Sequence, residues 1–414
     1  MNPTGFLFLT GWALFFVVPR GYGLTAWLVL LVGTWAFFRH TGIDSTQPPK
    51  AALSQINWVH LAPFLAWGSV SLGVMLFHGE KPNTLEQTLP YLLSPLLYVG
   101  LKRAHFSLQH FFIASALAAI GSGLLAMGIL LSSTEPDRVV GLMSNHIAYG
   151  NLSALFGLLA VFGLLTPKTV DVADHLGDTI PASRLFPAIC FLGGLMGIAA
   201  SFASGTKGGW ISVVSIGLLL VFQIIRRHGR FGLIWTAAFF GLLLLWTFAF
   251  PNNVMVHRLD QAFEALSAAV SVGSPPTDGS IGARWAMITH GFDVYAASGS
   301  WLLGVERDAL LFEVSERISP LVFGGVVQQI PNLHNEVMDT LATRGLVGLV
   351  AYIVLYGGVA WVACRPDFSG HQRQVILLML IAFLEFGLSN VQFEVGSMRL
   401  AFVILMMTLL TRTR

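Results

Sequence analysis

Long apolar runs alternate with short polar connections along most of the chain. Many of the runs are long enough to cross the roughly 30 Å hydrocarbon core of a bilayer as a helix. Because an unpaired backbone polar group is costly in lipid, such runs predict membrane-spanning helices. We expect about twelve spans with approximate limits, at residues 6–18, 22–38, 58–77, 88–101, 106–131, 143–165, 185–203, 208–225, 231–250, 346–363, 375–388 and 397–411.

The longest interruption of this pattern is residues 251–345, between the ninth and tenth spans. Its apolar spacing predicts helices at 254–270 and 283–297. Glycine, serine and proline in 271–282 predict a loop, and the pattern does not decide the structure of 301–314. We therefore expect an all-α polytopic membrane protein whose long segment is mainly helical. Its parts are residues 1–250 with nine spans, 251–345 as the extramembrane segment, and 346–414 with three spans.

The composition supports this class and orients it. Hydrophobic residues make up 55% of the 414 residues and charged residues only 11%, whereas soluble domains carry about 25% charge. If the N-terminus is cytoplasmic, the even-numbered connections and the C-terminal tail hold most of the 23 lysines and arginines. The positive-inside rule then places both termini in the cytoplasm and residues 251–345 outside it. No basic tract exceeds residues 226–230, so we expect no nucleic-acid partner.

The end of the long segment is the first candidate for chemistry. We expect a helix from about Asn332 to Arg344, with Asn332 as the N-cap and Gly345 just past the C-terminus. His334 would lie in the first turn, where the helix N-terminus disfavours a charged imidazolium. A neutral imidazole there could accept a proton from a hydroxyl as a general base. Alternatively, His334 only caps or packs its own helix.

Two cations are candidates for binding an anion. Arg284, beside Trp285, offers the planar guanidinium that recognises phosphate oxygens, although lipid headgroups are an alternative partner. Lys207 lies in Ser204-Gly205-Thr206-Lys207-Gly208-Gly209-Trp210, between the seventh and eighth spans. Glycines let backbone amides approach an anion, and the following span offers its N-terminus. The alternative is a tight turn between helices with a snorkelling lysine.

The other polar positions carry weaker signals. Asn145, His146 and Asn151 lie at the outer end of the sixth span, where they either serve function or hydrogen-bond between helices. Glu385 is the main ionisable candidate inside a span. His290, Arg307, Glu313, Glu316 and Arg317 show no spacing that distinguishes them from a solvated face. No paired aspartates or His/Cys cluster indicates a metal site, so we expect neither a metal nor another cofactor.

Three short motifs stand out. Two lie in or at the end of the long segment: Arg284-Trp285, and His334-Asn335-Glu336 with Asp339 and Arg344-Gly345-Leu346-Val347-Gly348. The third is the Lys207 motif, before the eighth span. Together with the number of spans, they resemble the O-antigen ligase family, within the wider O-antigen ligase and polymerase superfamily. The chain departs from the family at Lys207, where the family usually has arginine. Lysine keeps the charge but loses the bidentate fork.

The resemblance implies a C-type membrane glycosyltransferase in the bacterial inner membrane. Such enzymes move a glycan from undecaprenyl diphosphate to a hydroxyl of lipid A–core at the periplasmic face. His334 would be the catalytic base, Arg284 a catalytic residue, and Arg284 with Lys207 would hold the diphosphate. Asn145, His146 and Asn335 would contribute to substrate binding, the reaction would be inverting and metal-independent, and membrane lipids would surround the chain. The alternatives are an O-antigen polymerase, a protein O-oligosaccharyltransferase and, less favoured because intramembrane charges are scarce, a transporter.

Overall fold

The computed structural model describes residues 56–103, 107–132, 139–143, 145–166, 185–249, 279–322 and 328–411, with isolated residues between 11 and 34 and Ser267. In this part of the chain every regular element is a helix, and eight helices are long and apolar enough to cross a membrane. The helices are α4 (Trp58–Phe77), the 3₁₀ helix η1 (Pro82–Gln87), α5 (Leu89–Leu92), α6 (Ser94–Arg103), α7 (Leu108–Ser132), α8 (His146–Gly163), α9 (Leu185–Ala203), α10 (Lys207–His228), α11 (Arg230–Ala249), α13 (Gly279–Ala297), α14 (Arg307–Val322), α15 (Glu336–Ala363), α16 (Gly370–Ser389) and α17 (Gly396–Leu410).

The helices agree closely with the predicted spans from residue 58 onward. Helices α4 and α9 have the predicted limits, 58–77 and 185–203. The fourth expected span, 88–101, is instead two short helices, α5 and α6, which meet at Leu93. Helix α17 is apolar but has only 15 residues. The first two expected spans, and the helix expected at 254–270, fall outside the described residues apart from isolated positions.

Small residues bring α7, α8 and α9 into close contact. A Cβ on Gly193 of α9 would lie 2.6 Å from Ala116 Cα of α7, and one on Gly197 would lie 2.8 Å from Gly157 Cα of α8. Neither separation can hold a side chain, so the backbones themselves touch. Between membrane helices, association depends on such close van der Waals packing because the lipid tails are equally apolar.

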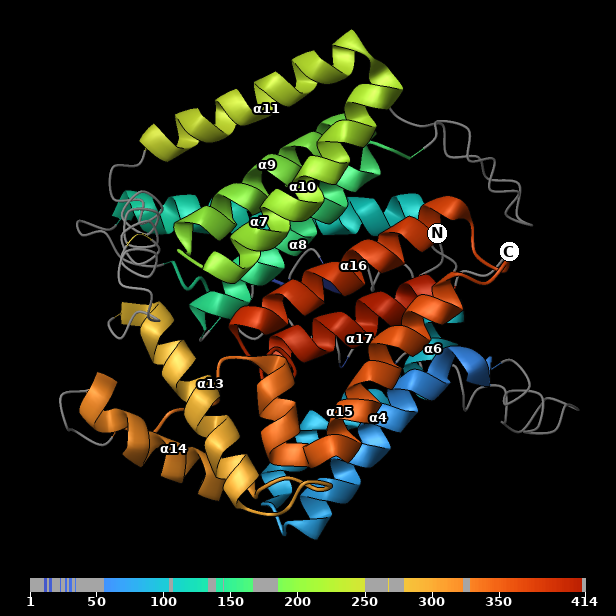
Figure 1. Cartoon of the computed structure of the whole chain (residues 1–414). Coiled ribbons are helices and arrows are strands. Elements are labelled where there is room, and N and C mark those ends of the chain that lie inside the picture. Colours follow the sequence, from blue (N-terminus) through green and yellow to red (C-terminus); the bar gives the residue numbers. More distant parts are fainter. Residues whose placement is uncertain are drawn as a thin grey trace, which may run out of the picture.

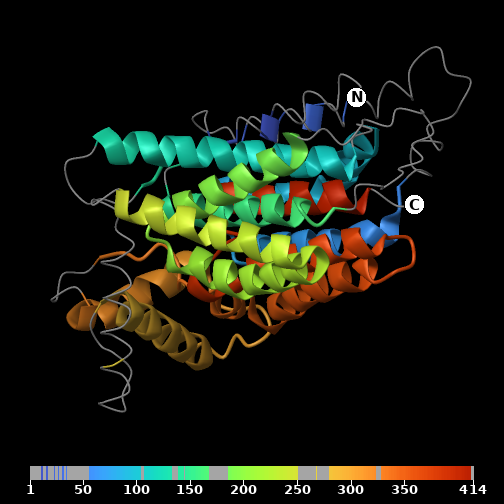
Figure 2. The same ribbon diagram turned by 90° about the horizontal axis from the view of Figure 1, so that it is seen from above.

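The bundle has two opposite ends, which side-chain contacts define. At one end, the start of α4 meets the end of α17, with His60 Nδ1 3.1 Å from Leu410 O. At the other end, His78 just after α4 approaches Leu303 O at 3.0 Å, next to α13 and α14. Figures 1 and 2 show α13 and α14 projecting from this second end. The first end carries Lys102, Arg226, Arg227, Arg230, Arg365 and Arg373 at helix termini and connections, as the positive-inside orientation predicts.

The projecting part has its own hydrophobic core. Helices α13 and α14 pack on the start of α15 through Met287, Tyr295, Leu310, Val314 and Leu333, among other buried residues. The helix expected at 283–297 is present, but it begins earlier, at Gly279. The loop expected over 271–282 is therefore wrong at its last four residues, which extend α13 by a turn. A compact helical unit thus sits beside the entry of α15 into the bundle.

Candidate active site

The His334 turn precedes a helix that starts later than the sequence predicts. Helix α15 begins at Glu336, and its N-cap is Asn335, whose Oδ1 accepts a hydrogen bond from Met338 N at 2.9 Å. The N-cap prediction for Asn332 is wrong because its Oδ1 accepts a hydrogen bond from His334 N at 3.0 Å and closes a separate turn. His334 therefore lies before the helix and not in its first turn.

The backbone of His334 has an unusual conformation. Its φ of 53° makes it the one residue other than glycine with a positive φ in the described part of the chain. Residues other than glycine seldom adopt this region, and such conformations persist where the surroundings hold them. The turn points the imidazole into a half-buried position, and its Nδ1 has no hydrogen-bond partner among the described residues. Buried polar atoms are usually paired, so water or a substrate is the expected partner.

The electrostatic surroundings keep the His334 imidazole neutral. Burial is the main cause that lowers its pKa, and the positive charge of Arg284 lowers it further, from 6.5 to about 4. The Asn390 side chain opposes the shift only in part. Arg284 lies on the half-exposed face of α13, and Gly291 of the same helix packs on Leu333, next to His334. The packing of α13 on this turn therefore brings a guanidinium close to a neutral imidazole.

The polar helix of α15 ends in a kink at Gly345. This glycine has φ 63° and ψ −164°, which interrupts the helix between Arg344 and the apolar part of α15. Leu346 N and Val347 N turn away to donate to Trp301 O at 2.9 Å and Leu302 O at 3.1 Å. The expectation that Gly345 ends the polar helix is thus confirmed, although the chain continues directly into a span. The kink ties the site to the α13–α14 unit.

Glu336 and Glu394 hold the connection between α16 and α17 against the site. The buried Glu336 carboxylate accepts hydrogen bonds from the backbone amides of Gln392 and of Phe393, the latter at 3.0 Å. Glu394 accepts from Arg307 at 2.9 Å and from Arg344 at 3.4 Å. Burial would raise the pKa of Glu394, but the three arginines around it, Arg307 first, hold that pKa below its usual value.

The sequence interpretation of Arg307 as a solvated side chain is wrong. The pattern suggests a solvated arginine, but its side chain is only 12% exposed and pairs with Asp339 at 3.0 Å as well as with Glu394. Helical spacing within α14 cannot reveal this, because both partners lie on other elements. The only available signal is the polar break at residues 389–394, which contains Glu394. By contrast, Glu313 and Arg317 form an exposed pair within α14, as expected.

The Lys207 motif forms the turn between α9 and α10. Lys207 is the first residue of α10. The side chain of the N-cap residue, Thr206, makes no hydrogen bond to the first backbone amides of the helix. The glycines face the protein: a Cβ on Gly208 would overlap Ser389 Oγ, and one on Gly209 would lie 2.8 Å from Ser201 Oγ. Close helix packing therefore accounts for both glycines, whereas anion binding rests on Lys207 and the helix N-terminus.

The start of α8 adjoins this turn. Asn145 is the N-cap of α8, and its Oδ1 accepts hydrogen bonds from Ile147 N at 2.8 Å and Ala148 N at 3.3 Å. That oxygen is occupied by capping, so only the amide nitrogen of Asn145 is left for a substrate. Thr206 Oγ1 donates to His146 O at 3.0 Å. Asn151 is fully buried, and neither of its side-chain polar atoms has a partner among the described residues.

The end of α16 connects the candidate residues. Ser389 packs against Gly208 in the Lys207 turn, and Asn390 lies beside the His334 ring. Asn335 Nδ2 donates to Leu388 O at 3.3 Å. Contacts therefore run from the Lys207 turn through the α16 terminus to His334, whose ring also feels the charge of Arg284. All of these positions lie at the end of the bundle from which α13 and α14 project (Figure 1).

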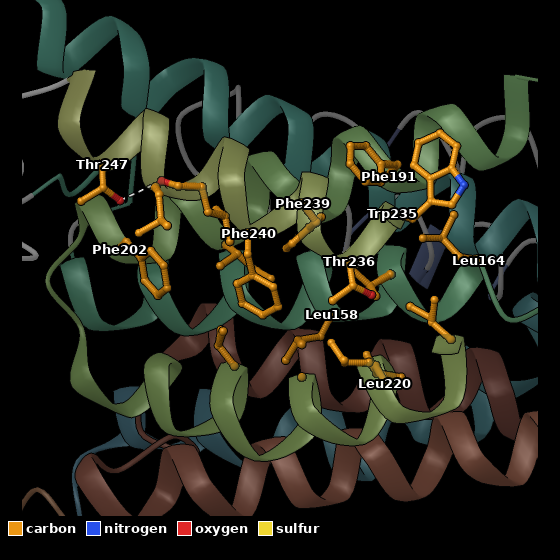
Figure 3. Close-up of a pocket in the computed structure, with 18 residues that line it drawn as sticks. Leu158, Leu164, Phe191, Phe202, Leu220, Trp235, Thr236, Phe239, Phe240 and Thr247 are labelled. Carbon is orange, nitrogen blue, oxygen red and sulfur yellow. Dashed lines mark hydrogen bonds between the residues drawn. The ribbon is translucent and has the colours of Figure 1, made fainter. Parts of the chain in front are cut away.

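An apolar cavity of about 280 Å³ lies beside the Lys207 turn, between α8, α9, α10 and α11. Its walls run from Phe202 and Val213 near the turn to Trp235 and Ile224 at the far end. Figure 3 shows the aromatic side chains of α9 and α11 directed into this space. Phe202 also stacks edge-on against Trp210, with ring centroids 5.8 Å apart. The lining thus comes within two residues of the Lys207 motif on α9, at Phe202, and within three on α10, at Val213.

In the described residues, no group of three or more His, Cys, Asp or Glu side chains is placed to hold a metal ion. The described residues of the site offer a neutral imidazole, cations and helix N-terminal amides. Such groups can accept a proton and stabilise negative charge on oxygen. This combination is suited to transfer from a phosphate leaving group.

An apolar helical bundle with a helical unit over one end defines a multi-pass membrane protein with a candidate site at the membrane border. Residues 192–353 match the family model described as O-antigen ligase, so this stretch is similar to that family. The match spans Lys207, Arg284 and His334. It indicates a membrane enzyme of the glycosyltransferase kind in lipopolysaccharide assembly, of the ligase or polymerase type. No curated protein sequence matches the chain.

Proposed function

We propose that this protein is an O-antigen ligase of the bacterial inner membrane. It transfers a glycan from undecaprenyl diphosphate to a hydroxyl of lipid A–core at the periplasmic face. The observation that carries the proposal is His334, which is neutral, held in a left-handed turn and close to Arg284. The family match includes this turn. Neither a nucleotide nor a metal is needed, because the donor already carries an activated sugar–diphosphate bond.

Each site residue has a separate role in the proposed reaction. His334 accepts the proton of the acceptor hydroxyl while the hydroxyl oxygen attacks the anomeric carbon. The bond from that carbon to the diphosphate oxygen breaks, and the configuration inverts. Arg284, Lys207 and the first amides of α10 stabilise the charge that develops on the diphosphate. Asn335 and His146 line the approach of the sugars, a role that Asn145 shares only through its amide nitrogen.

The cavity between α9, α10 and α11 supplies a place for the polyprenyl tail. It extends along α10 from Val213 to Ile224, which corresponds to roughly 16 Å at the rise of an α-helix. Phe202, at the end of this lining nearest the Lys207 turn, packs against Trp210. A diphosphate at Lys207 would therefore leave its tail pointing into an apolar space within the bundle, where burial is favourable.

The test of the site compares purified His334→Ala and Arg284→Ala proteins with the wild type. Activity is measured as transfer from lipid-linked glycan to lipid A–core in vesicles. We expect losses of roughly 100-fold or more for each variant, since each removes a transition-state contribution. His290→Ala is the matched control: His290 lies on α13, is partly exposed and pairs with the exposed Asp293, and the variant should retain activity. Wild-type rates in both site variants would refute the proposal.

A second assay distinguishes the acceptors. The same donor is offered with lipid A–core vesicles, with a second lipid-linked glycan, or with an acceptor protein. A ligase extends lipid A–core, a polymerase elongates the lipid-linked glycan, and an oligosaccharyltransferase modifies the protein. Addition of EDTA should leave the rate unchanged, because cationic side chains take the place of a metal. Loss of activity that Mg²⁺ or Mn²⁺ restores would contradict metal independence.

The tail site is tested by filling the cavity. Gly217 lines it, and a Cβ there would meet no atom within 4 Å. We expect Gly217→Phe to raise the KM for the long-chain donor roughly tenfold, with little change for a short-chain analogue. Gly241→Phe is the control, since Gly241 of α11 has equal space but lies outside the cavity lining. Equal effects of both substitutions on the donor KM would refute the tail assignment.

A further inference from the structure

Three charged side chains converge beneath the His334 turn. Arg307 Nη1 lies 3.0 Å from Asp339 Oδ2 and 2.9 Å from Glu394 Oε1. Arg307 Nη2 also donates to Pro331 O at 3.1 Å. These three side chains come from α14, α15 and the α16–α17 connection. They therefore join three elements that are distant in sequence at one point.

Two of the contacts hold the backbone immediately before His334. Asp339 Oδ1 accepts a hydrogen bond from Leu333 N at 3.1 Å, while Arg307 holds the carbonyl of Pro331. Both backbone groups lie within three residues of His334. A positive φ at a residue other than glycine is disfavoured, so it must be imposed by its surroundings. Here the surroundings that hold it are the arginine and the carboxylate, together with Asn332 Oδ1, which accepts a hydrogen bond from His334 N.

The burial of these groups makes the restraint strong. The side chain of Asp339 is fully buried, and those of Arg307 and Glu394 are 12% and 11% exposed. Buried ion pairs are poorly screened, and removal of one partner leaves an uncompensated charge. Burial acts to lower the pKa of Arg307, yet the Asp339 and Glu394 carboxylates raise it above its usual value. The arginine therefore remains charged and keeps both carboxylates as partners.

We propose that Arg307, Asp339 and Glu394 are positioning residues that hold His334 in its left-handed turn and so aim its ring at the acceptor hydroxyl. The direction of the ring rests on the proposed function, whereas the restraint on the turn does not. The three residues touch no reacting group themselves. The alternative is a purely structural role, in which the ion pairs only attach α14 to the bundle.

The test uses conservative variants of the full chain in detergent or nanodiscs. Asp339→Asn retains an oxygen for Leu333 N but removes the negative charge opposite Arg307. Glu394→Gln removes the second carboxylate, and Arg307→Lys keeps the charge but cannot reach all three partners at once. Glu313→Gln is the matched control, because it breaks an exposed ion pair in the same helix, α14.

Two readouts separate positioning from mere attachment. The first is steady-state kinetics: a misplaced base should lower kcat about 10- to 100-fold and leave the donor KM within about twofold. The second is independent of activity. Carbethoxylation of His334, followed by mass spectrometry of its peptide against pH, reports the pKa and exposure of the ring. A released ring should react faster, with an apparent pKa that moves from about 4 toward 6.5.

The outcomes are distinct. Lower kcat together with a shifted His334 modification profile, in Asp339→Asn and Glu394→Gln but not in Glu313→Gln, supports positioning. Partial recovery in Arg307→Lys relative to Arg307→Ala adds to that support. An unchanged modification profile in the folded variants overturns the proposal, even where activity falls. If His334→Ala and Arg284→Ala both kept wild-type rates, the proposed function would fail, while the modification profile would still decide whether these residues hold the turn.

Discussion

The Gly345 kink gives a prediction whose size follows from the structure. Gly345 has φ 63° and ψ −164°, a region that is essentially restricted to glycine. In Gly345→Ala, the new Cβ would overlap the carbonyl group of Leu302 and lie 2.6 Å from Gly304 N. Both neighbours are backbone atoms, so no side chain can rotate away. The chain must therefore shift at the junction of α15 with the α13–α14 unit.

Two contributions set the expected loss of stability. The backbone conformation costs an alanine about 1–3 kcal/mol. A shift of the junction also weakens the hydrogen bonds from Leu346 N to Trp301 O and from Val347 N to Leu302 O, each worth about 1 kcal/mol net. Together they give about 3–5 kcal/mol, which is a factor of more than about 100 in the unfolding equilibrium. Activity should fall as well, because the same junction carries Arg344 and the helix behind His334.

Chemical unfolding of the purified protein in detergent measures the loss, and lipid A–core transfer measures the activity. Gly357→Ala is the matched control: it lies in the same helix, and its Cβ would meet nothing within 4 Å. That substitution should be neutral or stabilise by up to about 1 kcal/mol. The reasoning would be refuted if Gly345→Ala unfolded at the same denaturant concentration as Gly357→Ala and kept full transfer activity.

Three further outcomes are expected. First, because the pKa of His334 is about 4, the base stays neutral on acidification, so kcat/KM should remain level from about pH 7 to about pH 5 and fall only toward pH 4; an acid limb centred near 6.5 would contradict the buried, Arg284-flanked imidazole. Second, Lys207→Ala should raise the donor KM and lower kcat, whereas Lys207→Arg should retain most activity; equal losses, measured in the same transfer assay, would remove the charge-based role. Third, Gly208→Ala should destabilise by about 1–3 kcal/mol in denaturant unfolding through overlap with Ser389 Oγ, and an unaltered midpoint would show that α10 and α16 can separate freely.

Sequence patterns alone locate nearly all of the described helices. The limits of α4 and α9 are predicted because an apolar run ends where polar residues or a turn begin. The polar helix before Gly345 is recognisable in the same way, but its start is not. Asn332 and Asn335 are both good N-caps, and only the local turn at His334 decides that Asn335 takes the role.

For the candidate site, too, the sequence indicates some features and not others. His334, Arg284 and Lys207 stand out because each is a polar residue next to a span or within a short motif. The surroundings of His334 cannot be read in this way. Its neutral ring depends on burial and on Arg284, 50 residues away in sequence, and not on a helix N-terminus. The glycines of the Lys207 motif likewise prove to serve packing against Ser389 and Ser201.

Taken by itself, the sequence determined the membrane class, the approximate limits of most bundle helices and the short motifs that carry the family resemblance. These are properties of local composition and spacing, because each helix must satisfy its own backbone in lipid. The tertiary structure decided which charges meet. Arg307 reads as a solvated side chain along α14, yet folding places it between Asp339 and Glu394 beneath the His334 turn. The interaction between two charges depends on their distance in space. For residues on separate helices, that distance is determined only when the helices pack together.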